Sequence, residues 1–188
     1  MEVIRKRFFL GIVLGSLIFS MVLLPVHSAD ARYSYLGITW PSSVAKNLTY
    51  YRDSSSSANE IWNSAIYSWN NATSSIHFVN NGSSSGKVRL STVHITNTDA
   101  DGRTQAYADS SNHIYSSYSW FNTAFTQNYS SQKAQSVAAH ELGHVLGLDE
   151  DLDFSKCLMY PTTPQRYDNW GIYTPQPSED VFGINDLY

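Results

Sequence analysis

The stretch HELGHVLGLDED, from His140 to Asp151, carries the most specific pattern in this sequence. Its two histidines are four residues apart, and residues i and i+4 lie on the same face of a helix. His140 and His144 can therefore present two imidazole nitrogens to one cation, and Glu141 can reach a water molecule bound to that cation. The pattern predicts a helix that carries one zinc ion, with Glu141 as the general base.

The third ligand of such a site must come from beyond the helix, because a catalytic zinc usually has three protein ligands and one open position. The helix is expected to end near Gly147, where a left-handed residue commonly turns the chain back. After that turn the third ligand falls at Glu150, and carboxylate oxygen is an accepted zinc ligand. Asp149 and Asp151 stay open as alternatives, because each lies one residue away.

The N-terminal residues have the layout of a secretory signal peptide. Basic residues at 5–7 precede an apolar run over 8–24, and small residues that offer a cleavage site after Ser28 or Ala31 follow, with the pattern A-D-A at 29–31. The apolar run is at the short end for spanning a bilayer, and the A-x-A pattern favours cleavage. We therefore expect residues 1–31 to be a signal peptide, and residues 32–188 to form one domain that is secreted to the extracellular space without membrane attachment.

The composition excludes some classes of partner. The formal net charge of −4 over 188 residues argues against binding to nucleic acid or to an anionic membrane surface. Cys157 is the one cysteine, so no intrachain disulfide can form and the fold must be held by its core and any bound metal. We expect a monomer.

Hydrophobic periodicity predicts an α+β domain in which a strand and a helix come first and further strands follow. Asn47–Arg52 alternates as a strand does, and Ala58–Ala72 repeats apolar residues at helical spacing. The later strands are expected at Ile76–Val79, Lys87–Thr96, Thr104–Ala108 and His113–Trp120. A change of phase within Lys87–Thr96 predicts a β-bulge there.

A second long helix and a closing helix are predicted toward the C-terminus. Ser130 or Ser131 can cap the long helix, which runs to about Leu148. Residues 149–177 contain four prolines and form a long loop, a kind of segment that is often functional. Ser178 can cap the closing helix, since acidic residues follow in its first turn.

Several stretches resemble the matrixins, the metzincin family that includes the matrix metalloproteinases. HELGHVLGL resembles the zinc helix, CLMYP (157–161) the Met-turn, SEDVFGINDLY (178–188) the closing helix, and NLTYYR with IWNSAIYSWN the opening strand and helix. The resemblance implies a metzincin-like catalytic domain with a twisted, mixed five-stranded sheet, two long helices and a C-terminal helix. It also implies a zinc endopeptidase that acts on a protein or peptide substrate.

The same resemblance implies roles for residues outside the zinc helix. Met159 would lie beneath the metal as a hydrophobic base. Pro161, Thr162 and Thr163 would line the pocket for the substrate side chain that follows the scissile bond. The strand near Thr104–Ala108 would pair with the extended substrate by β-augmentation.

The sequence departs from the family at the third ligand, which is normally histidine. If Glu150 is the ligand, its spacing from Met159 is one residue longer than is usual in matrix metalloproteinases, whereas Asp151 would match that spacing. The inhibitory cysteine of the family's zymogens is also absent, since Cys157 lies in the Met-turn. An alternative is therefore a non-catalytic extracellular binding module on a metzincin scaffold, although the intact Glu141 favours an enzyme.

A second metal is a further hypothesis. Histidines and aspartates that could hold a structural Ca²⁺ or a second Zn²⁺ occur in the middle of the chain, at His94, Asp99, Asp101, Asp109 and His113. The competing interpretation is that these are strand histidines and turn aspartates with no metal.

Overall fold

The structure is a computed structural model that describes residues 33–53, 56–82, 84–153 and 156–188. The predicted signal peptide lies outside the described residues. Ala31–Tyr188 forms one compact unit.

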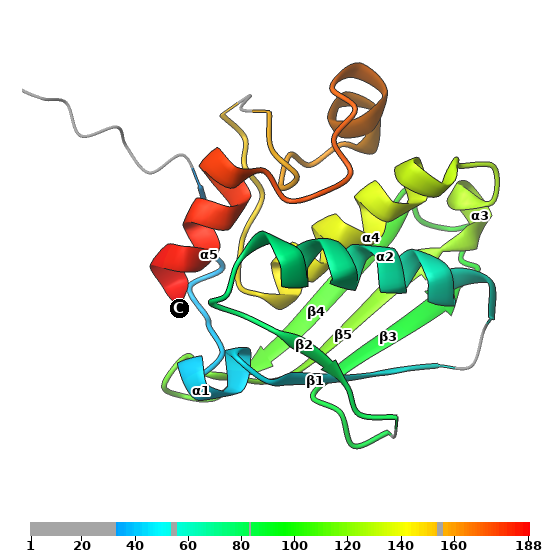
Figure 1. The fold of residues 1–188 in the computed structure, drawn as a ribbon. Coiled ribbons are helices and arrows are strands. Elements are labelled where there is room, and N and C mark those ends of the chain that lie inside the picture. The colour runs from blue at the N-terminus through cyan, green and yellow to red at the C-terminus, as the bar shows by residue number, and fades with distance from the viewer. Residues whose placement is uncertain (1–32, 54–55, 83, 154–155) are drawn as a thin grey trace, which may run out of the picture. The chain divides into compact units, whose positions relative to one another are not determined.

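Within the described residues, five strands form one mixed sheet in the order β2-β1-β3-β5-β4 (Figure 1). Four strands run parallel, and β4 pairs antiparallel with β5 at one edge. The strands are β1 (Leu48–Arg52), β2 (Phe78–Asn80), β3 (Val88–Val93), β4 (Gly102–Ala108) and β5 (Ile114–Asn122). The α+β class and the mixed five-stranded sheet are as predicted. An edge strand leaves one row of backbone groups available for pairing with another chain.

The predicted bulge in the third strand is wrong. Strand β3 keeps one regular register with β5 and ends at Val93, short of the predicted Thr96. Beyond it, the Asn122 side chain accepts from the backbone N of Ile95 at 3.0 Å and donates to the Ile95 carbonyl at 2.9 Å. A side-chain amide thus replaces a strand partner for Ile95, which explains why the apolar pattern continues past the end of the strand.

The two long helices, α2 (Ser56–Ala72) and α4 (Ser131–Val145), cover the same face of the sheet (Figure 1). Their apolar sides are buried against each other and against the strands, as the periodicity predicts. Trp69 of α2 is fully buried, and its indole Nε1 donates to the Ala139 carbonyl of α4 at 2.8 Å. Ser130 is the N-cap of α4, where its hydroxyl accepts from the backbone N of Lys133.

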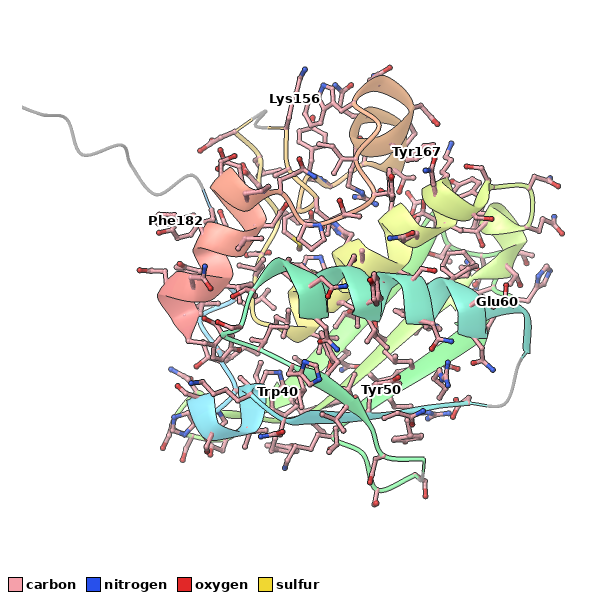
Figure 2. All side chains as sticks on the ribbon, in the orientation of Figure 1. Trp40, Tyr50, Glu60, Lys156, Tyr167 and Phe182 are labelled. Carbon is pink, nitrogen blue, oxygen red and sulfur yellow. The ribbon has the colours of Figure 1, made fainter. Side chains whose placement is uncertain are left out.

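The segment before β1 also reaches α4. Trp40 is 2% exposed, and its Nε1 donates to the Val145 carbonyl at 2.8 Å (Figure 2). The short helix α1 (Ser42–Ala45) follows, and another short helix, α3 (Thr123–Thr126), connects β5 to the loop before α4. Neither short helix was predicted, because four residues carry too little periodicity to stand out.

The C-terminal part packs along α4: Lys133 at the start of the helix pairs with Asp168, and the Tyr188 hydroxyl donates to the Leu146 carbonyl at its end (Figure 1). The predicted long loop contains a π-helical turn, η1 (Pro164–Asn169), which the sequence did not predict. The closing helix begins as a second π turn, η2 (Pro177–Val181), and continues as α5 (Phe182–Leu187). Among the described residues, no helix has the length and apolar character to cross a membrane.

Candidate metal centre

Helix α4 carries three of the predicted site residues on consecutive turns. His140 and His144 are one turn apart, and their rings meet edge to face with centroids separated by 4.7 Å. His140 is 4% exposed and Glu141 is 5% exposed, so both side chains are held inside the protein rather than in solvent. Burial restricts the orientations that the His140 ring can adopt, as a metal ligand requires.

The chain reverses direction directly after α4. Gly147 has a φ of +97°, a conformation that residues with a side chain rarely adopt. Its carbonyl accepts from the backbone N of Leu36 at 3.0 Å, and the backbone N of Asp149 donates to the Ser34 carbonyl at 2.8 Å. The N-terminal segment therefore holds the turn from outside, and the chain comes back past the histidines at Glu150.

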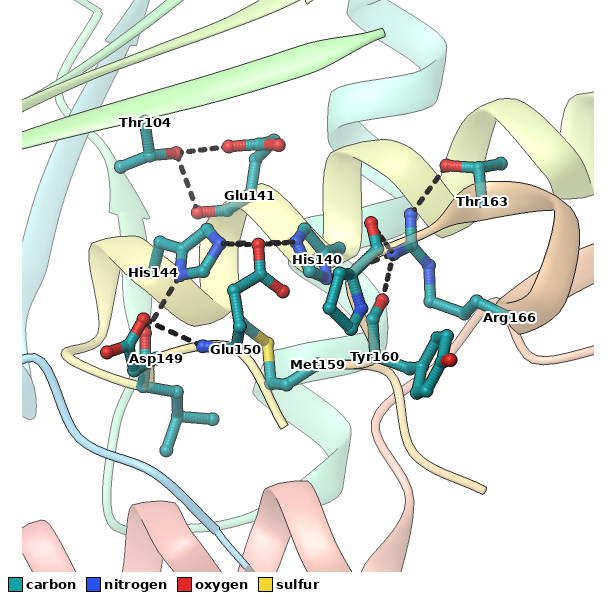
Figure 3. Close-up of polar contacts among 12 residues, drawn as sticks. Thr104, His140, Glu141, His144, Asp149, Glu150, Met159, Tyr160, Thr163 and Arg166 are labelled. Atoms are coloured by element: carbon teal, nitrogen blue, oxygen red, sulfur yellow. Dashed lines mark hydrogen bonds and ion pairs between the residues drawn. The ribbon is translucent and has the colours of Figure 1, made fainter. Parts of the chain in front are cut away.

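Three potential ligand atoms converge at this point (Figure 3). Oε1 of Glu150 lies 3.5 Å from Nε2 of His140 and 3.4 Å from Nε2 of His144. The two Nε2 atoms are 3.1 Å apart. Among the described residues, this is the one group of histidine, cysteine and acidic side chains whose ligand atoms gather within 4.8 Å.

The surroundings of the two rings suit a cation between them. Nδ1 of His140 lies 2.8 Å from the Leu158 carbonyl, and Nδ1 of His144 lies 2.9 Å from the Leu148 carbonyl. A carbonyl can only accept, so the tautomer with the proton on Nδ1 satisfies both carbonyls and turns Nε2 of each ring toward the cluster. Two imidazole lone pairs and a carboxylate that face one another repel unless a proton or a metal cation lies between them. Oε2 of Glu150 is also buried without a hydrogen-bond partner, so this carboxylate has acceptor capacity left for a cation.

The ionisation of these groups follows from burial and from their mutual contacts. Burial lowers the pKa of His140 to about 4, and the nearby Arg166 guanidinium acts in the same direction. Burial also works to lower the pKa of His144, but the contact with Glu150 outweighs it and raises that pKa. Burial works to raise the pKa of Glu150, yet the two imidazoles hold it well below its usual range. Glu150 is therefore ionised at neutral pH, as a metal ligand must be.

The two alternative acids point elsewhere. Oδ1 of Asp149 accepts from the backbone N of Glu150 at 2.8 Å. Asp151 is 4% exposed; its Oδ2 accepts from the Cys157 thiol at 3.3 Å, and its Oδ1 accepts from the backbone N of Asp153 at 2.9 Å. Of the three neighbouring acids, the structure brings Glu150 to the imidazole nitrogens.

The residues considered for a second metal do not assemble in the same way. His94 directs Nδ1 to the Thr123 hydroxyl at 3.2 Å, and Asp109 uses Oδ1 to accept from the backbone N of His113 at 3.0 Å. In the part of the chain that the structure describes, the five residues form no group with converging ligand atoms. The interpretation as strand histidines and turn aspartates fits this arrangement, and we propose no second metal.

The Met-turn packs directly against α4. Met159 is 3% exposed, and its Sδ occupies the space where a Cβ on Gly143 would lie. Asp180 anchors the turn: its Oδ1 accepts from the backbone N of Met159, and its Oδ2 accepts from the backbone N atoms of Leu158 and Gln176, at 2.7–3.0 Å. Burial raises the pKa of Asp180 to about 6, against the opposing effect of these three donors.

The fold and the cluster of His140, His144 and Glu150 both agree with a comparison of the sequence with protein families. A model of the matrixin family matches residues 40–188, which is most of the chain. The chain belongs to the matrixins. The family assignment predicted from the sequence is thus confirmed, and a comparison with curated proteins found no match. Matrixins are zinc metallopeptidases, so the domain is one that generally binds zinc and hydrolyses proteins or peptides.

In this matrixin domain the side chain of Glu141 lies against strand β4 (Figure 3). The hydroxyl of Thr104 donates to Oε2 of Glu141 at 2.8 Å, and a Cβ added to Gly102 would lie 2.8 Å from Oε1. Burial raises the pKa of Glu141 to about 7. A carboxyl group with this pKa can exchange a proton near neutral pH, which suits a general base.

Cavities open on both sides of the cluster in the matrixin domain. One, of about 340 Å³, is lined by the end of the loop before β4 together with Glu141 and His144. The other, of about 510 Å³, includes His140 and the residues after the Met-turn; these are Pro161, Thr162, Thr163, Pro164 and Arg166. The three residues that the resemblance assigns to a substrate pocket therefore line a cavity next to the metal cluster.

Sequence reasoning missed Arg166, a fully buried arginine behind the cluster. Its guanidinium donates to the Tyr160 carbonyl at 2.6 Å, to Ser136 Oγ at 3.0 Å and to Thr163 Oγ1 at 2.9 Å, and it lies 3.1 Å from Nδ1 of His140. It thereby connects α4 to the wall of the larger cavity. No sequence signal identifies this role, because Arg166 lies in the short π turn η1, whose few residues show no periodicity.

Proposed function

We propose that this matrixin is a secreted zinc-dependent endopeptidase in which His140, His144 and Glu150 hold the catalytic zinc. The observation that carries the proposal is the convergence of two Nε2 atoms and one carboxylate oxygen at 3.1–3.5 Å from one another. Three protein ligands leave one position open, which distinguishes a catalytic zinc site from a closed structural one.

When bound, the zinc would polarise the scissile carbonyl and increase the acidity of a water molecule at the open position. Glu141 takes the proton of the attacking water and then delivers it to the amine that leaves. The carboxylate ligand Glu150 adds a negative charge that a third imidazole would not, so we expect a less acidic water than in a site with three histidines. The buried cation Arg166, next to His140, compensates part of that charge.

The path of the substrate follows from the edge strand and the cavities. Strand β4 has β5 on one side, so its other edge can pair with an extended peptide in the β-augmentation mode. The peptide would cross the cluster from one cavity to the other, with the side chain after the scissile bond beside Pro161, Thr162 and Thr163. The two cavities leave room for residues on both sides of the scissile bond, which supports an endopeptidase.

Secretion is proposed from the sequence. Residues 1–31 combine a basic start, an apolar run and a small-residue cleavage pattern, and matrixins are generally extracellular. The test is the N-terminal sequence of protein recovered from the medium of expressing cells. We expect a start near residue 32, and a chain that stays in the cell with Met1 intact would contradict the proposal.

The enzymatic test compares the purified secreted chain with Glu141→Ala, Glu150→Ala and Asp153→Ala. Asp153 is an exposed acid of the same loop and serves as the matched control. We expect one zinc per wild-type chain, casein hydrolysis abolished in Glu141→Ala with zinc retained, and zinc weakened in Glu150→Ala alone. Zinc binding unaffected by Glu150→Ala would exclude this ligand. A wild type without zinc or hydrolysis would leave the non-catalytic binding module.

A further inference from the structure

We propose that Thr104 and Gly102 are positioning residues, which hold the carboxylate of Glu141 in the orientation that a general base needs. The inference rests on the proposed function, and it adds residues from a different part of the chain that set the orientation of the general base. Helix α4 supplies Glu141, and strand β4 supplies the surface against which its side chain packs. We call this surface, formed by Gly102 and Thr104, the seat of Glu141. Only the tertiary fold brings the two elements together.

The polar side of the seat is a chain of hydroxyl groups. The Thr104 hydroxyl lies 2.8 Å from Oε2 and 2.9 Å from the backbone carbonyl of Glu141, and 2.7 Å from the hydroxyl of Ser119 on β5. Ser119 is fully buried and can donate to Thr104. The Thr104 proton is then available to Glu141, whose ionised carboxylate can only accept. Thr104 therefore contacts Glu141 at both its side chain and its backbone.

The other part of the seat is Gly102, which leaves room for Glu141 because it has no side chain. A Cβ on Gly102 would lie 2.8 Å from both Cγ and Oε1 of Glu141, and 2.8 Å from a methyl group of Val137. Atoms at these distances overlap, so any side chain at this position would push Glu141 away. Residues i and i+2 of a strand point to the same face, so Gly102 and Thr104 together shape the surface on which Glu141 rests.

A glutamate side chain has several rotamers, and only some of them place the carboxylate where it can act as a base. The rate of the chemical step therefore falls unless the surroundings of the side chain select the reactive rotamer. A hydrogen bond to a charged group that is removed by an isosteric change corresponds to about a tenfold loss or more. Because neither Thr104 nor Gly102 touches the three ligand atoms, the loss should fall on the chemical step. Zinc affinity should change little for this reason. The Michaelis constant should also change little, because the substitutions leave the backbone edge of β4 that pairs with the substrate in place.

The experiment uses the full secreted chain and measures casein and peptide hydrolysis, zinc content and thermal unfolding. Thr104→Val keeps the volume and removes the hydroxyl, Thr104→Ser keeps the hydroxyl, and Thr92→Val on β3 is the control for a hydroxyl lost from another strand. We expect kcat to fall about tenfold or more in Thr104→Val, with KM and zinc content within twofold of wild type. Thr104→Ser should retain most of the wild-type kcat, and Thr92→Val all of it.

Gly102→Ala is a second, independent variant, and it should also lower kcat with zinc retained. An unchanged kcat in Thr104→Val, an equal loss in Thr104→Ser, or a loss of zinc in Thr104→Val would each overturn the positioning role. If wild type is active and Glu141→Ala is not, these results reject the inference alone. If wild type binds no zinc or hydrolyses nothing, the proposed function fails and the inference fails with it.

Discussion

The turn at Gly147 offers a prediction that links stability to metal binding. Gly147→Ala must place a side chain at a φ of +97°, which costs about 1–3 kcal/mol. The added Cβ would also lie 2.7 Å from the Ile38 carbonyl oxygen, a backbone atom that cannot simply rotate away. A shift of Ile38 would weaken the nearby hydrogen bond from the backbone N of Leu36 to the Gly147 carbonyl, which contributes about 1 kcal/mol. We expect a total loss of about 2–4 kcal/mol.

Gly171→Ala is the matched control for this substitution. Gly171 has a φ of +70°, but a Cβ there would meet nothing within 4 Å, so only the backbone strain applies. Urea denaturation of both metal-free variants gives the two free energies of unfolding. We expect Gly147→Ala to lose at least about 1 kcal/mol more than Gly171→Ala, because the contact with Ile38 is added to the strain.

The turn also delivers Glu150 to the histidines, so Gly147→Ala should weaken zinc binding about 10- to 100-fold, the range seen when support for a ligand is lost. Gly171→Ala should leave it unchanged. Competition with a chromogenic chelator measures both. Equal stability losses in the two variants, or wild-type zinc affinity in Gly147→Ala, would refute the reasoning that the Ile38 contact holds the turn and that the turn positions the ligand.

Other predictions concern the Met-turn and pH. Asp180→Ala leaves three N–H groups without an acceptor, two of them buried, while it removes a buried charge. The net loss in the free energy of unfolding should be about 3 kcal/mol by urea denaturation. A loss below about 1 kcal/mol would show that this anchor is dispensable. Zinc affinity should fall about tenfold per pH unit as pH drops through the raised pKa of His144, since zinc must displace that proton. Chelator competition between pH 8 and pH 6 checks this, and a flat profile would contradict a proton on His144.

The elements with long regular periodicity were predictable from sequence. The helix that contains Trp69 was found because apolar residues recur along it. The helix after Ser130 was found from its capping serine and its histidine spacing, which depend only on local geometry. The end of β3 was not predictable, because Asn122, which is distant in sequence, provides the hydrogen bonds that replace the strand beyond Val93. The π turn at Pro164–Asn169 was also missed, because a single turn leaves too short a pattern to detect.

The sequence by itself determined the family, the i, i+4 pair of His140 and His144, and the left-handed turn at Gly147, because these depend on helix geometry and on one residue's freedom at positive φ. Only the tertiary structure decided which of the three acids faces the imidazoles. The direction of a side chain after a turn depends on dihedral angles that the N-terminal segment imposes through its hydrogen bonds. The contact of Thr104 with Glu141 likewise exists only because β4 packs against α4.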